Sequence, residues 1–170
     1  MSEDFAQELK LMADSVDRLL SDEHAFDKRA KRLESPHGFL AADWKSFASL
    51  GWLGVSLPES VGGMGAGVQS AAVLSEQFGK HLLVGPFVSS IQLGAGIVCL
   101  AGDANQCARW VEPTVAGESH LALAWAEPAG RFDLHHVEAS ATAMQDGFRL
   151  SGRKVGVLFG GLADWIIVSA

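Results

Sequence analysis

The sequence predicts an α+β fold, in which an N-terminal all-helical bundle is followed by a partial antiparallel β domain. Two observations support this prediction. Apolar residues recur every three to four positions up to about residue 117, which is the spacing of amphipathic helices. Beyond that point they alternate with polar residues, as in half-buried strands. We therefore expect a helical domain over 1–117 and an incomplete β domain over 118–170.

Several segments of the first part have helical periodicity. Gly51 is placed to end one helix, because a helix C-terminus favours glycine. Asp103 is suited to cap another helix, which Pro113 then interrupts or ends. The segments with the clearest period are 4–21, 38–51, 68–80 and 86–102.

Two stretches between these helices lack their pattern. Residues 21–37 form a polar stretch with the charge cluster DKRAKR. Residues 51–67 are rich in glycine and predict a structured loop. Within it, GGMGAG resembles a phosphate-binding loop, but no strand precedes it and no Lys-Ser/Thr pair follows. We interpret it as a tight turn between helices.

The second part predicts several short strands. LALAWA, 121–126, is the first. VEASATAM and FRLSG flank the turn Gln145-Asp146-Gly147, and an Asp-Gly pair between two alternating runs is a strong hairpin signal. KVGVLF, 154–159, and DWIIVSA, 164–170, predict two more strands.

Composition and charge exclude several classes of protein. Of the 170 residues, 48% are hydrophobic and 19% charged, so the chain can bury a core. The net charge of −7 argues against a nucleic-acid partner. The N-terminus lacks the pattern of a signal peptide, and Cys99 and Cys107 show neither a disulfide framework nor a metal pattern, so we expect a cytoplasmic protein. The uncharged run 82–102 predicts a buried helix rather than a membrane span, because Gly85 and Pro86 interrupt it.

Four segments, in the same order, resemble the acyl-CoA dehydrogenases, flavoproteins that oxidise acyl-CoA thioesters to enoyl-CoA. SLGWLGVSLPESVGGMGAG resembles the loop between the second and third helices of that family, and DANQCARWVEPTVAGE resembles its helix leading into the β domain. LALAWAEP resembles the strand that ends in Thr-Glu-Pro. SGRKVGVLFGGLADWIIVSA resembles the segment that reads Gly-x-Lys-x-Trp-Ile-Thr-Asn, followed by Ala-Asp.

The resemblance implies FAD as cofactor and an oxidation in which a base removes the substrate α-proton while hydride leaves the β-carbon for the flavin. It implies that the base, a glutamate, comes from a C-terminal helical domain beyond Ala170. It also implies an acyl-CoA substrate, an electron-transfer flavoprotein or similar acceptor, a homo- or hetero-oligomer with a related subunit, and a place in fatty acid or sterol side-chain β-oxidation.

The resemblance assigns positions to the cofactor, and several of these depart from the family pattern. Ala126 stands where the family has a threonine, Arg131 where it has a glycine, and Phe132 where it has a serine. In the second segment, Trp, Thr and Asn are replaced by Gly156, Leu158 and Phe159. The cofactor-binding positions carried over are Leu123, Trp125, Ala126, Phe132, Gly156 and Leu158; the substrate-binding positions are Ser89, Leu93 and Phe132.

Other charged and polar residues have two interpretations each. Glu127 is a turn residue at the strand end rather than a catalytic acid. Arg131 is either a phosphate ligand or a solvated turn charge. His135 and His136 are turn or edge residues rather than metal ligands, because adjacent strand residues point to opposite faces. Ser89, Leu93 and Gly96 share a helix face, which serves either the acyl chain or core packing.

These observations lead to one functional hypothesis and two alternatives. We expect a subunit or fragment of an FAD-dependent acyl-CoA dehydrogenase that has lost flavin contacts, is inactive alone, and is paired with a flavin-competent subunit. The first alternative is a non-catalytic partner or acyl-CoA-binding interaction module on the same scaffold. The second is an ordinary dehydrogenase that has been cut short.

Overall fold

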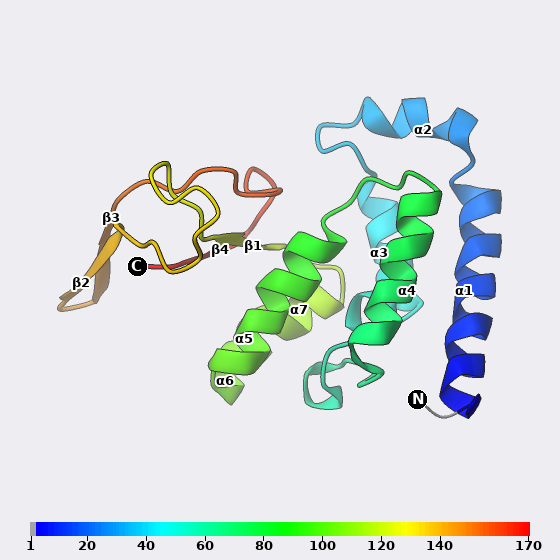
Figure 1. Ribbon diagram of the computed structural model, residues 1–170, viewed down its shortest axis with the longest axis horizontal. Helices are drawn as coiled ribbons and strands as arrows, with labels where there is room; N and C mark the ends of the chain where they lie inside the picture. The colour runs from blue at the N-terminus through cyan, green and yellow to red at the C-terminus, as the bar shows by residue number, and fades with distance from the viewer. Residues whose placement is uncertain (1–2) are drawn as a thin grey trace.

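The computed structural model describes residues 3–170; residues 1–2 of the predicted helical domain lie outside the described residues. Among the described residues, helices occupy the chain up to residue 115 and short strands follow, which confirms the predicted fold class. In Figure 1, α1 lies at one end of the molecule, and the β2–β3 hairpin projects from the other. The helical elements up to the loop before α4 are α1 (Glu3–Glu23), α2 (Phe26–Leu33), α3 (Ala41–Ser49) and the short 3-10 turns η1 (Trp52–Gly54) and η2 (Glu59–Val61).

The charge cluster DKRAKR forms α2 and fastens the end of α1, a role that its polar character did not indicate. The last turn of α1 contains no basic residue, so its terminal carbonyls need outside donors. Lys28 Nζ donates to the carbonyl of Asp22 at 2.7 Å, and Arg32 Nη2 donates to that of Glu23 at 2.9 Å. Arg32 Nε also pairs with Asp43 at 2.7 Å. These cations stabilise the negative end of the α1 dipole.

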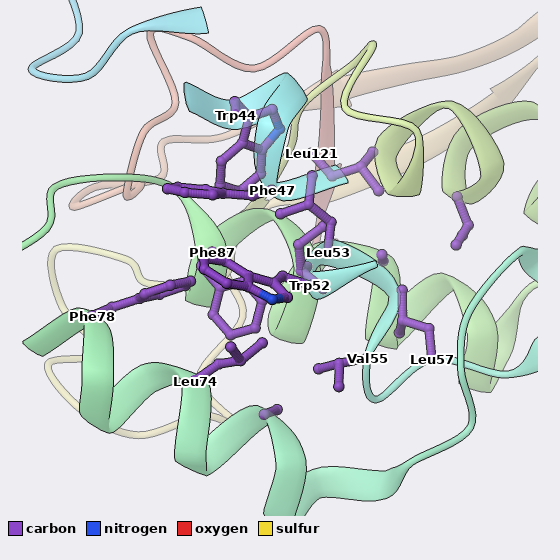
Figure 2. Close-up of a cluster of buried hydrophobic side chains, with 14 of the residues drawn as sticks. Trp44, Phe47, Trp52, Leu53, Val55, Leu57, Leu74, Phe78, Phe87 and Leu121 are labelled. Carbon is purple, nitrogen blue, oxygen red and sulfur yellow. The ribbon is translucent and has the colours of Figure 1, made fainter. Parts of the chain in front are cut away.

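Aromatic side chains fill the centre of the helical part (Figure 2). Phe47 of α3 stacks on Trp52 and on Phe78, with ring centroids 5.1 and 5.6 Å apart. Phe78 meets Phe87 edge-on at 5.2 Å. Such arrangements suit the quadrupoles of aromatic rings and add to the stabilisation from burial. Leu53, which is 0% exposed, packs in the same cluster.

The glycine-rich stretch 51–67 is a structured loop, as predicted. Gly51 has φ of 76°, the left-handed conformation that ends α3. The loop folds back on itself, so that the amide of Met64 donates to the carbonyl of Gly54 at 2.9 Å. A Cβ at Gly63 would collide with the carbonyl of Leu57, so only glycine fits there. The glycines thus serve a tight return of the backbone.

Three helical segments follow the loop: α4, then η3 continued by α5, then α6 continued by η4 and α7. Asp103 caps α6 at the start of the third segment, as predicted: its side chain accepts from the amide of Gln106 at 2.8 Å, and the Gln106 side chain accepts from the amide of Asp103 at 2.9 Å. Pro113 lies where a π-helical stretch gives way to the final α-helical turn, and the helix ends at Val115. The elements are α4 (Gly67–Lys80), the π-helix η3 (Phe87–Ala95), α5 (Gly96–Ala101), α6 (Ala104–Gln106), the π-helix η4 (Cys107–Val111) and α7 (Glu112–Val115).

The uncharged run 82–102 forms η3 and α5 and buries Phe87, Ile91 and Val98, as expected of an internal helix. Within residues 3–170, no helix has both the length and the hydropathy to cross a membrane.

The strands form two separate pairs. β1 (Leu121–Ala124) and β4 (Trp165–Val168) are parallel, with Leu121 opposite Trp165. β2 (Ser140–Met144) and β3 (Gly147–Ser151) form the predicted antiparallel hairpin, which closes at Met144 and Gly147. The parallel pairing of β1 with β4 differs from the antiparallel expectation. It is possible because the chain between these strands is long enough for a crossover.

The predicted strand at 154–159 is absent from the described residues, and this prediction was wrong. Gly156 and Phe159 have φ of 62° and 53°, which bends the chain away from an extended path. Phe159 meets Phe39 of the helical part edge-on at 6.3 Å. A packing contact with the helices therefore overrides the alternating pattern in this segment.

Candidate functional site

The candidate site is the end of β1, where the two segments that carry the strongest motifs come together. The amide of Val155 donates to the carbonyl of Ala126 at 2.9 Å. Lys154 Nζ lies 3.4 Å from the carbonyl of Trp125. LALAWAEP and SGRKVG, more than twenty residues apart in sequence, are therefore neighbours in space.

β1 is held in place from its helical side by η3. Ser90 is fully buried, and its Oγ accepts a hydrogen bond from the amide of Leu121 at 2.9 Å. A Cβ on Gly94 would lie 2.6 Å from the Cβ of Leu121, so glycine is required for this close approach. The helix and the strand therefore form one rigid support for the site.

Glu127 and Lys154 form a buried ion pair beside the strand end. Lys154 Nζ donates to Glu127 Oε1 at 2.7 Å and to Ser169 Oγ at 2.8 Å. The amides of Glu138 and Ala139 donate to the two carboxylate oxygens of Glu127 at 2.7 and 2.9 Å. Because Glu127 is only 3% exposed, these contacts replace the water that its charge requires.

This environment fixes the charge of Glu127. The hydrogen bond from Lys154 and those from the Ala139 and Glu138 amides lower the pKa of Glu127 to about 2, against the opposing effect of burial. A carboxylate with this pKa holds no proton at neutral pH and cannot serve as a general acid there. Glu127 therefore fixes the strand end, as interpreted from the sequence. The sequence did not lead to a pairing of Glu127 with Lys154, although both residues lie in segments that resemble family motifs.

His136 and Glu138 lie near this pair but are poorly placed to build a metal centre. One ligand atom from each of Glu127, His136 and Glu138 lies within 4.8 Å of the others. Lys154, however, places an ammonium 2.7 Å from Glu127 Oε1 and already supplies the positive charge. His135 and His136 lie in the turn region before β2, in agreement with the interpretation as turn residues.

The turn after the ion pair carries two substitutions with visible consequences. Arg131 is exposed and has φ of 51°, a conformation that glycine adopts without strain. A glycine at this position, which the resemblance implies, is therefore explained by the backbone. Phe132 is 93% exposed, so its ring lies in solvent instead of filling an internal space.

The facing segment is equally open. Gly156 has no atom within 4 Å of the place where a Cβ would stand. Leu158 is 61% exposed. Phe159, in contrast, is half-buried against the helical part, and its left-handed backbone suits the asparagine implied by the resemblance. Neither Gly156 nor Leu158 closes the space in front of the strand end.

The alternation of β1 identifies the backbone edge that is turned away from β4. The carbonyl of His120 accepts from Trp165, and that of Ala124 from Ser169, so the even-numbered residues face β4. Leu121 points its amide the other way, to Ser90. Successive residues of a strand direct their backbone groups to opposite edges. The amide of Leu123 is therefore directed away from β4.

The substrate-binding positions implied by the resemblance do not share one environment. Ser89 is 4% exposed, and its Oγ donates to the carbonyl of Pro86 at 3.2 Å. Leu93 is 37% exposed. Both lie in η3, whose π-helical turn is wider than the α-helical turn used to place them with Gly96 on one face. Phe132 lies in the turn after β1 and is 93% exposed.

An apolar cavity of about 320 Å³ lies between α5, η4 and the strands β1 and β4, and it was not anticipated from the sequence. Arg109 lies over the rings of Trp110 and Trp165, with its guanidinium 5.6 and 5.2 Å from the two ring centroids. In the sequence, Trp110 and Trp165, each within a segment that resembles a family motif, were the residues that could have indicated this cavity. The cavity is lined by Ile97, Val98, Ala101, Gly102, Gln106, Trp110, Leu121, Trp165, Ile166 and Ile167.

Comparison with protein families matches residues 6–118 to the family described as Acyl-CoA dehydrogenase, N-terminal domain. The chain belongs to the acyl-CoA dehydrogenase family, which is a family of oxidoreductases. The resemblance stated from the motifs is thereby confirmed.

Individual relatives agree with this assignment. The chain is 29% identical over its full length to the benzylmalonyl-CoA dehydrogenase of Aromatoleum aromaticum, of which it covers 45%. A variant of the Tcur3481-Tcur3483 steroid ACAD has a TM-score of 0.86 at 28% identity, over 98% of this chain and 45% of that one. An acyl-CoA dehydrogenase complexed with FAD from Bacillus anthracis has a TM-score of 0.84 at 25% identity, over 100% and 30%. The chain thus spans less than half the length of these relatives.

Several side chains at the positions that the resemblance assigns to the flavin offer neither a hydrogen bond nor a ring surface. A flavin edge needs hydrogen-bond donors and a surface on which the ring can lie. The Leu123 amide is suitably directed, but Ala126 and Leu158 carry no donor, and Gly156 offers no ring surface. The open space around Gly156 and the exposure of Leu158 leave room for a ring without holding one.

Proposed function

We propose that this chain is a subunit or fragment of an FAD-dependent acyl-CoA dehydrogenase, which oxidises acyl-CoA to trans-2-enoyl-CoA, and that it is inactive by itself. The family assignment supports the reaction class. The observation that carries the proposal concerns the end of β1. Its backbone is fastened by the buried pair of Glu127 and Lys154, yet the side chains in front of it offer no polar contact.

In that proposal, the residues of this chain hold the end of β1 in place beside the cofactor. Lys154 binds the carbonyl of Trp125, the carboxylate of Glu127 and the hydroxyl of Ser169, and so fixes three segments relative to one another. The Leu123 amide borders the cofactor from the strand edge. Phe132 and Leu158 are both mostly exposed and add apolar surface to this part of the chain. The proton-accepting glutamate comes from outside residues 1–170.

A related subunit completes the site in this proposal. The Tcur3481-Tcur3483 steroid ACAD, which resembles this chain in fold and sequence, is named for two components. We propose a hetero-oligomer in which the second subunit holds the flavin firmly, with an electron-transfer flavoprotein or a similar acceptor receiving the electrons. The substrates proposed are acyl-CoA thioesters, with sterol side chains among the candidates.

The visible absorption spectrum of the purified chain tests the flavin part of the proposal. The chain alone is expected to be colourless, and flavin absorption is expected to appear with a complementary subunit. Ala126→Thr restores one donor, and a hydrogen bond worth about 1 kcal/mol should tighten flavin binding by roughly fivefold. Ala143→Thr on the exposed hairpin is the matched control and should leave binding unchanged. A yellow homomer with normal turnover would refute the proposal.

A non-catalytic interaction module on the same scaffold is the second candidate, and the exposed apolar residues of the β part favour it. Phe132, Leu134 and Phe148 are 93%, 70% and 73% exposed. A surface of this kind suits contact with another protein. Isothermal titration separates the candidates, because a pure interaction module binds neither acyl-CoA nor flavin.

A further inference from the structure

The turn between α5 and α6 is tight. A Cβ on Gly102 would lie 2.7 Å from the carbonyl oxygen of Val98 and 3.1 Å from Gln106 Oε1, so only glycine fits. Asp103 begins the next helix at once, through its reciprocal bonds with Gln106. The end of α5 and the start of the following helix are therefore held close together.

The only two cysteines of the chain stand symmetrically about this turn. Cys99 precedes Asp103 by four residues and Cys107 follows it by four, so each lies about one helical turn away. α5 packs against η4, and Cys107 Sγ lies 3.7 Å from the carbonyl oxygen of Val98, the residue next to Cys99. Both are free thiols and half-buried.

The two thiols also influence each other. Burial, and after it the neighbouring Cys107 thiol, raises the pKa of Cys99. Near neutral pH, the Cys99 thiol therefore stays protonated and is a poor nucleophile by itself. Burial alone would make these residues simple packing groups. Because the two thiols lie near each other across the turn, they can form a disulfide, which a single buried cysteine cannot.

We propose that Cys99 and Cys107 are a reversible dithiol site that peroxide closes to an intramolecular disulfide. Cys107 Sγ attacks one oxygen of hydrogen peroxide, the O–O bond breaks, water leaves, and Cys107 becomes a sulfenic acid. Cys99 Sγ then attacks the sulfenic sulfur and gives up its proton to the departing hydroxyl, so that the S–S bond forms and a second water leaves. In sum, two thiols and one H₂O₂ give one disulfide and two waters. A dithiol reductant reverses the closure.

Closure would tie α5 to η4 beside the apolar cavity. Val98, Gly102 and Gln106 belong both to this turn and to the cavity wall. Fixing the turn therefore fixes one side of the cavity. A disulfide that closes a short loop without distorting it stabilises the folded state by restricting the unfolded chain.

Intact mass spectrometry tests the site on the full chain. After stoichiometric hydrogen peroxide and alkylation under denaturing conditions, the monomer should be about 2 Da lighter and carry no alkyl group. The midpoint of thermal unfolding should rise by roughly 5 °C and return to its starting value after dithiothreitol. Two alkylatable thiols after peroxide, oxygen adducts without loss of mass, or crosslinks only between chains would each overturn the proposal.

Matched variants separate the site from general oxidation. Cys99→Ser and Cys107→Ser, tested singly, should show neither the loss of mass nor the rise in midpoint. The double variant with alanine at both positions should keep the helical circular dichroism, which shows that the fold does not depend on the thiols. A disulfide that forms only in denaturant, or that lowers the unfolding midpoint of the native chain, would also contradict the inference.

Discussion

In the core of the helical part, large aromatic side chains are enclosed by other side chains, whereas two phenylalanines of the β part lie in solvent. Trp44 and Phe47 are 2% and 3% exposed, while Phe132 and Phe148 are 93% and 73% exposed. The helical part obtains its stability from apolar burial. The β part depends on a few specific contacts, above all the ion pair of Glu127 and Lys154. The two parts should therefore respond differently to the same kind of perturbation.

The largest effect is expected from a cavity in the helical core. Leu53→Ala removes a side chain that is 0% exposed and should lower the free energy of unfolding by about 2–5 kcal/mol. Chemical denaturation followed by circular dichroism measures the loss. Leu100→Ala, at a position 89% exposed, is the control and should change stability by less than about 0.5 kcal/mol. Equal effects at the two positions would contradict the described core.

Glu127→Gln should loosen the β part while leaving the helical core intact. The variant loses the charge that accepts the amides of Glu138 and Ala139, so their hydrogen exchange should accelerate by about tenfold. Exchange in α4 should not change. Glu138→Gln, whose side chain is largely exposed, serves as the control. If α4 exchanges faster in the Glu127 variant, the two parts are more strongly coupled than their packing indicates.

A smaller gain is expected at the turn after the ion pair. Arg131→Gly relieves a left-handed backbone, offset by the greater freedom of glycine in the unfolded chain, for a net gain of roughly 0.5 kcal/mol. Ala129→Gly, where φ is not positive, should destabilise by a similar amount. Denaturation midpoints of the two variants should therefore move in opposite directions.

The most gradual effect concerns pH. Burial lowers the pKa of His120 from 6.5, so the folded state favours the neutral ring and the unfolded chain binds more protons just below that pH. The free energy of unfolding should fall as the pH drops below about 6.5. His120→Phe keeps the ring beside Trp44, 5.4 Å away, and should reduce this slope. Glu127 has a depressed pKa, so its contribution is lost only between about 4.5 and 2.

Local signals in the sequence predicted the local structure well. Periodicity located α1, α3 and α4, glycine at 51 ended a helix, and Asp-Gly closed the hairpin. Each of these features depends on residues close together in sequence.

Long-range contacts were not predictable in the same way. The segment DKRAKR is held as a helix partly by its hydrogen bonds to carbonyls at the end of α1. The bend at 154–159 accompanies the pairing of Lys154 with Glu127 and the packing of Phe159 on Phe39. The parallel register of β1 and β4 joins residues 44 positions apart. The motif segments did indicate which parts would meet, but not through which atoms.

The pairing of β1 with β4 also sets an order of events during synthesis. β1 lacks its ladder partner until Trp165–Val168 have been made, and its anchoring lysine follows Glu127 by 27 residues. The helices before residue 115 precede β4 in the chain, so they can pack while β1 is still without its ladder partner. The candidate site is thus the last part of this chain to form, on a support that is already in place.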